Sequence, residues 1–192
     1  MELKDKTVLF LGSSVTYGSA AGGVSFADLM GEICRFRCVK QAVSGTTLAD
    51  INERSYVARL KAIGESERPD LLICQLSTND ASPSKGVDLR DTEAAIRFIL
   101  EYAETVFRCP VVFFTGTFYE NKKYEAMIDL LYSLQKEYRF SILDLFHDAE
   151  MRAVSAEDYS RYMKDPIHPT SEGYREWWTP RFISFCQNLA ES

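Results

Sequence analysis

Two stretches of this sequence, far apart in the chain, hold residue types that together could cleave an ester. The first follows the apolar run Val8–Leu11, where Gly12 precedes the hydroxyl residues Ser13 and Ser14. A serine is a weak nucleophile and needs an adjacent base, which must itself be oriented by a third group. The second stretch, Asp165-Pro166-Ile167-His168-Pro169, offers an imidazole with a carboxylate three residues before it. This combination predicts acyl transfer to a serine.

Each stretch also has a simpler interpretation. The first turn could be a plain strand-to-helix connection, and the second could be a helix N-terminal turn with a solvated histidine. Only two histidines occur in the chain, and His147 lies in Asp144-Leu145-Phe146-His147-Asp148 without flanking prolines. Because proline restrains the backbone by fixing φ, His168 is the better candidate for the base.

Four short blocks, in the same order, resemble those of the SGNH (GDSL-like) hydrolases, a family of serine esterases and lipases. Gly12-Ser13-Ser14 resembles the nucleophile block, in which Gly-Asp-Ser is commonest, and Gly45 lies in a stretch similar to the glycine block. Asn79 is similar to the asparagine of the Gly-x-Asn-Asp block, and Asp165-Pro166-Ile167-His168 resembles the terminal Asp-x-x-His block. Together the blocks span most of the chain.

The resemblance implies a role for each matching residue. Ser14 would be the nucleophile, His168 the general base, and Asp165 would fix the tautomer of His168. The backbone N–H groups of Ser14 and Gly45 and the side-chain amide of Asn79 would donate to the oxyanion. One such donor is typically worth about 3–4 kcal/mol of transition-state stabilisation. Taken alone, Gly45 and Asn79 could be ordinary turn residues, and Asn79 could also cap a helix.

Two positions depart from the family pattern. Ser13 stands where the family usually has aspartate, which leaves open how the nucleophile turn is held. Ser77 stands where the family usually has glycine, which leaves open the freedom of the backbone just before Asn79.

Several other motifs are excluded by their spacing. Gly12 and Gly18 are followed by Ser19 and not by Lys, so this turn is no Walker A phosphate loop. Neither the dinucleotide fingerprint Gly-x-Gly-x-x-Gly nor the nucleophile elbow Gly-x-Ser-x-Gly occurs where its fold requires it. The acidic pair Asp88 and Asp91 has no evident shared pocket, and we expect it to be solvated surface.

Composition places the chain among ordinary globular proteins. Its 192 residues fit one domain spanning residues 1–192, with 46% hydrophobic and 26% charged residues. A net charge of −6 with scattered Lys and Arg argues against a nucleic-acid partner. No stretch reaches the roughly 18 apolar residues of a membrane span, and the N-terminus does not resemble a signal peptide.

The cysteine pattern indicates reduced thiols in a cytoplasmic protein. There are five cysteines, an odd number, and most have apolar neighbours. Cys34 and Cys38 lack a second pair at zinc-binding spacing, so we expect no metal, and no other cofactor motif is present.

Strands alternate with helices along the chain. Strands are predicted over Val8–Leu11, Arg37–Val43, Leu71–Leu76, Pro110–Phe114 and Phe140–Asp144. Helices are predicted from Ser25 onward, over Leu48–Ile63, Asp91–Phe107, Tyr124–Tyr138 and Ala149–Val154, and over Ser171–Leu189, where Pro180 could break the helix. The alternation predicts an α/β fold of three layers, α/β/α, with a five-stranded parallel sheet in the flavodoxin-like order 2-1-3-4-5.

The order of the elements places the candidate site residues together. Ser14, Gly45 and Asn79 follow the first, second and third predicted strands, so all three emerge at one edge of the sheet, where ligands gather in such folds. The aromatic residues of the last helix are expected to pack in the core.

These features favour a serine esterase that hydrolyses small O-acyl esters, such as acetyl groups on carbohydrate, through an acyl-enzyme intermediate. The loops beside the candidate site are short, and the longest, Ala81–Arg90, is polar, which favours a short acyl chain. A lysophospholipase or thioesterase with the same residues remains an alternative, as does a catalytically weak binding module on the same fold. The expected partner is a small-molecule ester.

Overall fold

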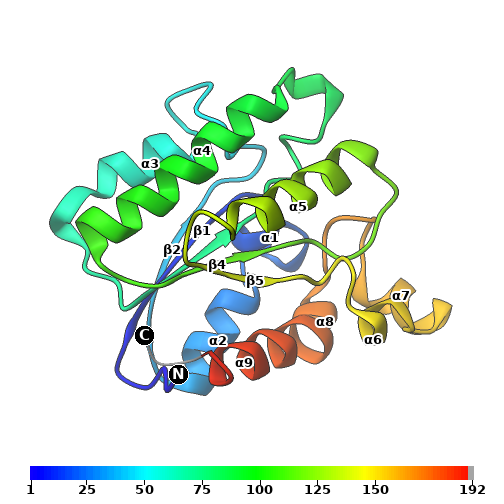
Figure 1. Cartoon of the computed structure of the whole chain (residues 1–192). Coiled ribbons are helices and arrows are strands. Elements are labelled where there is room, and N and C mark those ends of the chain that lie inside the picture. Colours follow the sequence, from blue (N-terminus) through cyan, green and yellow to red (C-terminus); the bar gives the residue numbers. More distant parts are fainter. Residues whose placement is uncertain (190–192) are drawn as a thin grey trace.

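A parallel sheet of five strands forms the centre of the computed structural model, which describes residues 1–189 (Figure 1). The strand order is β2-β1-β3-β4-β5, which confirms the order predicted from the sequence. Neighbouring strands are all parallel, and β1 lies between β2 and β3. The strands are β1 Thr7–Gly12, β2 Arg37–Ala42, β3 Leu71–Gln75, β4 Val111–Phe114 and β5 Ser141–Leu143.

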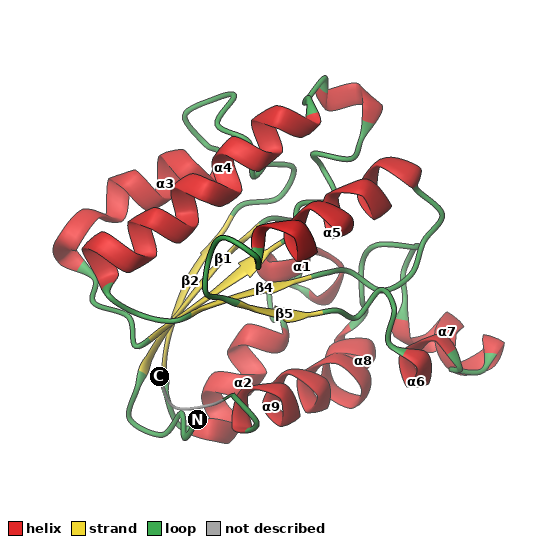
Figure 2. Ribbon diagram, in the orientation of Figure 1, coloured by secondary structure: helices red, strands yellow, loops and turns green. Residues whose placement is uncertain are grey.

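Helices cover both faces of the sheet. Helices α3, α4 and α5 lie over one face, and α2, α8 and α9 lie over the other, as Figures 1 and 2 show. The α-helices are α1 Ser14–Tyr17, α2 Phe26–Cys34, α3 Tyr56–Ile63, α4 Leu89–Tyr102, α5 Lys122–Leu134, α6 Ala149–Arg152, α7 Ala156–Tyr162, α8 Ser171–Gly173 and α9 Thr179–Gln187. The 3-10 turns are η1 Ser19–Ala21, η2 Gly64–Ser66 and η3 Pro83–Lys85, and the π-helical turns are η4 Ala103–Phe107 and η5 Tyr174–Trp178.

Alternate residues of each strand enter one of two hydrophobic cores. In β1, Leu9 and Leu11 pack into the core beneath α3, α4 and α5, whereas Val8 and Phe10 pack into the core beneath α2 and α9. This division follows from the two-residue period of a strand, which sends successive side chains to opposite faces. Both faces of β1 are therefore apolar, as a central parallel strand requires.

The aromatic residues near the C-terminus build much of the second core, which confirms the prediction for most of them. Tyr174, Trp178 and Phe182 are buried, and the ring of Phe182 stacks on Phe26 at 4.0 Å between centroids. Trp177 and Phe185 are only partly buried and pack at the edge of this core. None of the described helices is long and apolar enough to cross a membrane.

The helix predicted over Leu48–Ile63 is wrong in its first half. Only Tyr56–Ile63 is helical, and Ser55 caps it by accepting a hydrogen bond from the Ala58 N–H. The preceding segment has the composition of a helix, but the buried carboxylate of Asp80 accepts the N–H groups of Leu48 and Ala49 at 2.8 and 2.9 Å. Leu48 and Ala49 are 32 and 31 residues from Asp80 in the sequence. No local sequence pattern could therefore show that Asp80, and not a helix, would bind their N–H groups.

Asp88 and Asp91 are exposed to solvent, which confirms the prediction, and they also have a structural role. They form a capping box at the start of α4: Asp88 accepts from the backbone of the first turn, and Asp91 accepts from the Asp88 N–H at 3.1 Å. The first N–H groups of a helix have no partner within it. The two carboxylates accept hydrogen bonds from backbone N–H groups at this end, and this sets the start of α4.

Two further differences concern the C-terminal third. The sequence prediction missed α7, whose start is marked by Ser155 accepting a hydrogen bond from the Asp158 N–H at 3.0 Å. The last helix is not broken at Pro180. Instead the chain passes from α8 through the π-helical turn η5 into α9, and Pro180 lies in the first turn of α9, directly after η5.

Candidate active site

The turn between β1 and α1 presents Ser14. Gly12 ends β1, Ser13 occupies the N-cap position, and Ser14 begins α1 with a nearly buried side chain. A side chain at Gly12 is impossible, because its Cβ would lie 1.9 Å from the hydroxyl oxygen of Thr16. Since α1 is a single turn of four residues, the position of Ser14 depends on the contacts around the turn and not on a long helix.

The structure brings Ser14 and His168 into contact. The Ser14 hydroxyl oxygen lies 2.8 Å from Nε2 of His168, which satisfies the distance expected for a nucleophile and its base. The two residues are 154 positions apart in the chain. The contact therefore depends on the sheet, which places the end of β1 next to the loop that follows α7.

The carboxylate of Asp165 holds His168 on its other side. Its two oxygens lie 3.0 and 2.8 Å from Nδ1 of His168. One of them also accepts hydrogen bonds from the backbone N–H groups of Ile167 and His168, at 2.8 and 2.9 Å, which stabilises the turn between Asp165 and His168. Burial alone would raise the pKa of Asp165, but these hydrogen bonds outweigh it and lower the pKa below its usual value.

The backbone of the Asp165–His168 loop is fixed at both ends. Met163 and Pro169 form an antiparallel bridge, and the Lys164 N–H donates to the His168 carbonyl at 2.9 Å. These bonds close the loop into a tight turn, so the imidazole has little freedom to leave Ser14.

A second Asp-x-x-His pair has the same local geometry without a serine. Nδ1 of His147 lies 2.8 Å from Asp144, but the imidazole is exposed. Asp144 also accepts the hydroxyl groups of Thr115 and Tyr132, at 3.1 and 2.8 Å, which ties β4 and α5 to the end of β5. The sequence-based choice of His168 over His147 therefore agrees with the side chain that Ser14 contacts.

Gly45 and Asn79 reach the same edge of the sheet through a chain of hydrogen bonds. The side-chain amide of Asn79 donates to the Thr46 carbonyl at 2.9 Å, directly beside Gly45. The Val43 N–H donates to the Gly12 carbonyl at 3.3 Å, which joins the glycine loop to the nucleophile turn. An asparagine amide has two N–H hydrogens, so one remains for a ligand.

Gly45 is required for its backbone conformation and not for lack of space. Its φ is +76°, in the region that L side chains rarely adopt, while a Cβ there would meet nothing within 4 Å. The Gly45 carbonyl accepts from Lys85 Nζ at 2.8 Å, which turns the peptide so that the carbonyl faces the Ala81–Arg90 loop.

Ser77, which replaces the usual glycine, causes no backbone strain. It does not have a positive φ, and its hydroxyl accepts the Asp80 N–H at 3.3 Å. Asp80 in turn is fully buried and holds the loop at Leu48 and Ala49. Burial raises the pKa of Asp80, and the hydrogen bonds it accepts oppose that rise.

Gln75 is a functional candidate that the sequence did not reveal. It lies fully buried at the end of β3, and its amide oxygen accepts from the N–H groups of Ser13 and Thr16 and from the Thr16 hydroxyl, at 3.0, 3.2 and 2.8 Å. Its amide nitrogen donates to the Ser13 hydroxyl at 3.2 Å. Gln75 therefore holds the turn that carries Ser14. This explains how the turn is held although Ser13 stands where the family usually has aspartate.

Arg59 is a second residue that the sequence did not single out. Its guanidinium donates to the carbonyls of Gly12, at 2.8 Å, and Gln41, and to the Thr46 hydroxyl, at 3.3 Å. It also lies over the ring of Tyr56, 5.1 Å from the centroid. Burial lowers the pKa of Arg59, and the guanidinium joins the ends of β1 and β2 to the glycine loop.

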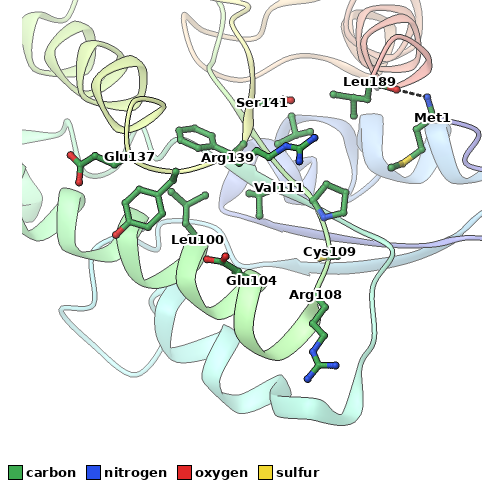
Figure 3. A pocket seen from close by; sticks show the side chains of 14 residues that line it. Met1, Leu100, Glu104, Arg108, Cys109, Val111, Glu137, Arg139, Ser141 and Leu189 are labelled. Atoms are coloured by element: carbon green, nitrogen blue, oxygen red, sulfur yellow. Dashed lines mark hydrogen bonds between the residues drawn. The ribbon is translucent and has the colours of Figure 1, made fainter. Parts of the chain in front are cut away.

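Two cavities lie at opposite edges of the sheet. The larger, about 720 Å³, is lined by residues at the starts of β4 and β5 and is bordered by the hydrogen bond from the Met1 amino group to the Leu189 carbonyl (Figure 3). It is therefore at the amino edge, away from Ser14. The smaller, about 490 Å³, lies beyond the carboxyl ends of β4 and β5. Among residues 1–189, no group of three or more His, Cys, Asp or Glu side chains is placed to bind a metal ion.

Comparison with known proteins identifies the family. The chain matches the model of the GDSL-like lipase/acylhydrolase family over residues 10–176. No curated protein matches the sequence.

Solved structures share the fold over nearly the whole chain. A protein from Lactobacillus plantarum is 19% identical with a TM-score of 0.81, covering 98% of this chain and 99% of that one. A lipase/acylhydrolase from Enterococcus faecalis is 15% identical with a TM-score of 0.74, covering 95% of each chain. A carbohydrate acetylesterase family member from Sinorhizobium meliloti is 15% identical with a TM-score of 0.68, covering 96% of this chain and 100% of that one. The family match over most of the chain shows that this protein belongs to the GDSL-like lipase/acylhydrolase family and is a carboxylic ester hydrolase.

Proposed function

We propose that this protein is a serine esterase that cleaves small O-acyl esters, such as acetyl groups on carbohydrate, through an acyl-enzyme intermediate. The observation that carries the proposal is the 2.8 Å contact between the Ser14 hydroxyl and Nε2 of His168, because it joins a nucleophile to a base. The contact of Asp165 with Nδ1 supports it, since a proton held at Nδ1 leaves Nε2 free to accept another.

In the acylation step, the Ser14 oxygen attacks the ester carbonyl carbon while its proton passes to Nε2 of His168. The carbonyl π bond becomes an oxyanion, toward which the N–H groups of Ser14 and Gly45 and the free amide hydrogen of Asn79 would donate. The intermediate collapses when the bond to the alcohol oxygen breaks and Nε2 returns the proton to that oxygen. The alcohol leaves, and the acyl group stays on Ser14.

In the deacylation step, a water molecule takes the place of the alcohol. His168 accepts a proton from the water, whose oxygen attacks the acyl carbon. The second tetrahedral intermediate releases Ser14, which recovers its proton from His168, and the carboxylic acid leaves. Asp165 stays ionised throughout and stabilises the imidazolium that forms in each half-reaction.

The walls beside Ser14 favour a short acyl chain. The longest loop there, between Asn79 and α4, is polar, and it contacts the glycine loop through the bond from Lys85 to the Gly45 carbonyl. A long chain would need a broad apolar surface on this side. The similarity to a solved carbohydrate acetylesterase family member adds support for an acetyl group on carbohydrate.

The proposal is tested by turnover of p-nitrophenyl acetate and by labelling with a fluorophosphonate. We expect the Ser14→Ala variant to lose labelling and nearly all turnover. The Ser13→Ala variant is the matched control, because it removes a neighbouring hydroxyl and should keep labelling with a modest loss of rate. Equal labelling of the wild type and the Ser14→Ala variant would place the nucleophile elsewhere.

Acyl preference is tested separately with a series of esters from acetyl to octanoyl. We expect kcat/KM to fall as the chain lengthens beyond butyryl. More efficient hydrolysis of octanoyl esters, or of long-chain thioesters, would support the lysophospholipase or thioesterase alternative.

We also propose that the protein works in a reducing compartment such as the cytoplasm. All five cysteines are free, and two of them, Cys74 and Cys186, are buried. Burial raises the pKa of Cys186 to about 12, which keeps its thiol protonated and unreactive. Titration of the unfolded, unreduced protein should find all five thiols, and fewer would contradict a reducing compartment.

A further inference from the structure

The smaller cavity has the size and lining of a site for part of an organic ligand. It measures about 490 Å³, within the range of roughly 300–1,000 Å³ that small-molecule sites occupy. Its walls include Phe118 from the loop after β4, Leu145 from the loop after β5, and Met151 from α6. Tyr159 from α7 and Trp177 from η5 close the other side. Most of this lining is apolar or aromatic.

One end of the cavity adjoins the Asn79 block. Thr117 lines the cavity, and the residue before it, Gly116, lies against Thr78. A Cβ on Gly116 would be 4.0 Å from the methyl group of Thr78, which is the residue before Asn79. Gly116 and Thr78 therefore separate this end of the cavity from Asn79.

The other end of the cavity adjoins the Asp165–His168 loop. Tyr159 lines the cavity, and its backbone carbonyl accepts the Met163 N–H at 2.9 Å. Helix α7 continues directly into Met163, which pairs with Pro169, the residue after His168. Because Ser14, Asp165 and His168 do not line the cavity themselves, it would hold a part of the substrate at a distance from the scissile bond.

The aromatic rings of the cavity are held in place. Trp177 stacks on Tyr162 with 5.6 Å between ring centroids and meets Tyr159 edge-on at 6.3 Å. The Arg152 guanidinium covers the Phe118 ring at 4.1 Å from its centroid. Fixed aromatic rings offer flat faces and edges on which another six-membered ring can pack.

The reaction geometry decides which part of the ester would enter. The oxyanion must point toward Gly45 and Asn79, whereas the alcohol oxygen must approach His168 to receive its proton. The alcohol therefore lies on the His168 side, which the Tyr159 end of the cavity adjoins. On the basis of the proposed esterase function, we propose that this cavity binds the alcohol portion of the substrate as a six-membered ring, aromatic or pyranose, packed against Trp177, Tyr159 and Phe118.

The test fills the cavity from a residue that has no part in the chemistry. Ala156, at the start of α7, lines the cavity, and Ala153 is exposed nearby but does not. We expect Ala156→Phe to lower kcat/KM about tenfold or more for benzyl acetate, for methyl 6-O-acetylglucopyranoside, or for both. The same variant should lower kcat/KM for ethyl acetate clearly less, because its alcohol has no ring to enter the cavity, and Ala153→Phe should change neither class.

The two ring-bearing esters distinguish an aromatic from a pyranose occupant. The ester whose kcat/KM falls more in Ala156→Phe carries the kind of ring that the cavity binds. An equal loss for ethyl acetate, no loss for any ring-bearing ester, or a loss confined to esters with long acyl chains would each overturn the assignment of the alcohol to this cavity.

Binding without hydrolysis separates failure of this inference from failure of the esterase proposal. Trp177 is one of two tryptophans in the chain, and the other, Trp178, is fully buried. Benzyl alcohol and methyl glucopyranoside are the probes, and at least one should change tryptophan emission saturably, in the wild type and in Ser14→Ala alike. The change should be lost in Ala156→Phe. If ethyl acetate is hydrolysed and neither probe binds, the cavity assignment is wrong and the esterase proposal stands.

Discussion

Gln75 and Ser13 are joined by two reciprocal hydrogen bonds. The Gln75 amide oxygen accepts the Ser13 N–H at 3.0 Å, and its amide nitrogen donates to the Ser13 hydroxyl at 3.2 Å. The same oxygen also accepts from Thr16 on the far side of Ser14, so one buried side chain of β3 spans Ser14. The orientation of Ser14 thus depends on the strand beside its own. Gln75 is buried behind the turn, so we expect it to act as a positioning residue and not as a catalytic one.

Gln75→Leu should lower kcat about 10- to 100-fold with little change in KM. The variant leaves the N–H groups of Ser13 and Thr16 unpaired in a buried setting, which costs roughly 1–3 kcal/mol and lets the turn shift. Steady-state kinetics on p-nitrophenyl acetate measures both constants. Gln135→Leu is the matched control, since it removes an amide that donates to the Phe140 carbonyl far from Ser14. Parallel changes in kcat and KM, or none, would argue against a positioning role.

Asn79→Ala should lower kcat by about 10²- to 10³-fold, the usual effect of removing one oxyanion donor. The variant also loses the bond to the Thr46 carbonyl, so the melting temperature must be measured beside the kinetics. Asn121→Ala is the control, because Asn121 caps α5 by accepting the Tyr124 N–H at 2.9 Å. That control should lose stability and keep its kcat. A fully active Asn79→Ala enzyme would remove Asn79 from the proposed oxyanion site.

Gly45→Ala should reduce both stability and turnover. There is room for the methyl group, but φ is +76°, and an L residue in the left-handed region costs roughly 1–2 kcal/mol. Relief of that strain would rotate the peptide and move the N–H that is proposed to bind the oxyanion. Gly64→Ala is the control, with φ +55°, an equally open site and a position at the end of α3. Denaturant unfolding should show a loss in both variants, and kcat should fall only in Gly45→Ala. A similar loss of kcat in both would assign it to stability alone.

Asp165→Asn should make the melting temperature depend less on pH in the acidic range. The pKa of Asp165 is lowered in the folded protein, so its contribution to stability is complete above the unfolded value of about 3.9 and is lost as pH falls through the folded value. The difference in melting temperature between wild type and variant should therefore be largest near neutral pH and shrink toward pH 2–3. Asp129→Asn, at an exposed position on α5, controls for the loss of a surface charge. A pH-independent difference would contradict the lowered pKa.

The sequence by itself determined the order of the layers and the edge at which the candidate site forms. Apolar runs of strand length alternate with helical patterns, and this alternation is sufficient for a parallel sheet, because parallel strands need long crossovers. Once the strands are in order, Ser14, Gly45 and Asn79 must emerge on one side. The Asp165–His168 spacing was also readable, because the carboxylate bonds to backbone and imidazole within its own turn.

Tertiary structure alone decided the features that rest on contacts between distant residues. Leu48 and Ala49 leave the predicted helix because Asp80 captures their N–H groups, a competition that no local propensity records. Gln75 looks like any residue at the end of a buried strand until the nucleophile turn folds over it. The cavity between Phe118 and Trp177 exists only because the loops after β4 and β5 meet α6, α7 and η5 there. Sequence patterns report the local energy of each segment, whereas the support of Ser14 and the shape of the ligand site depend on which segments become neighbours.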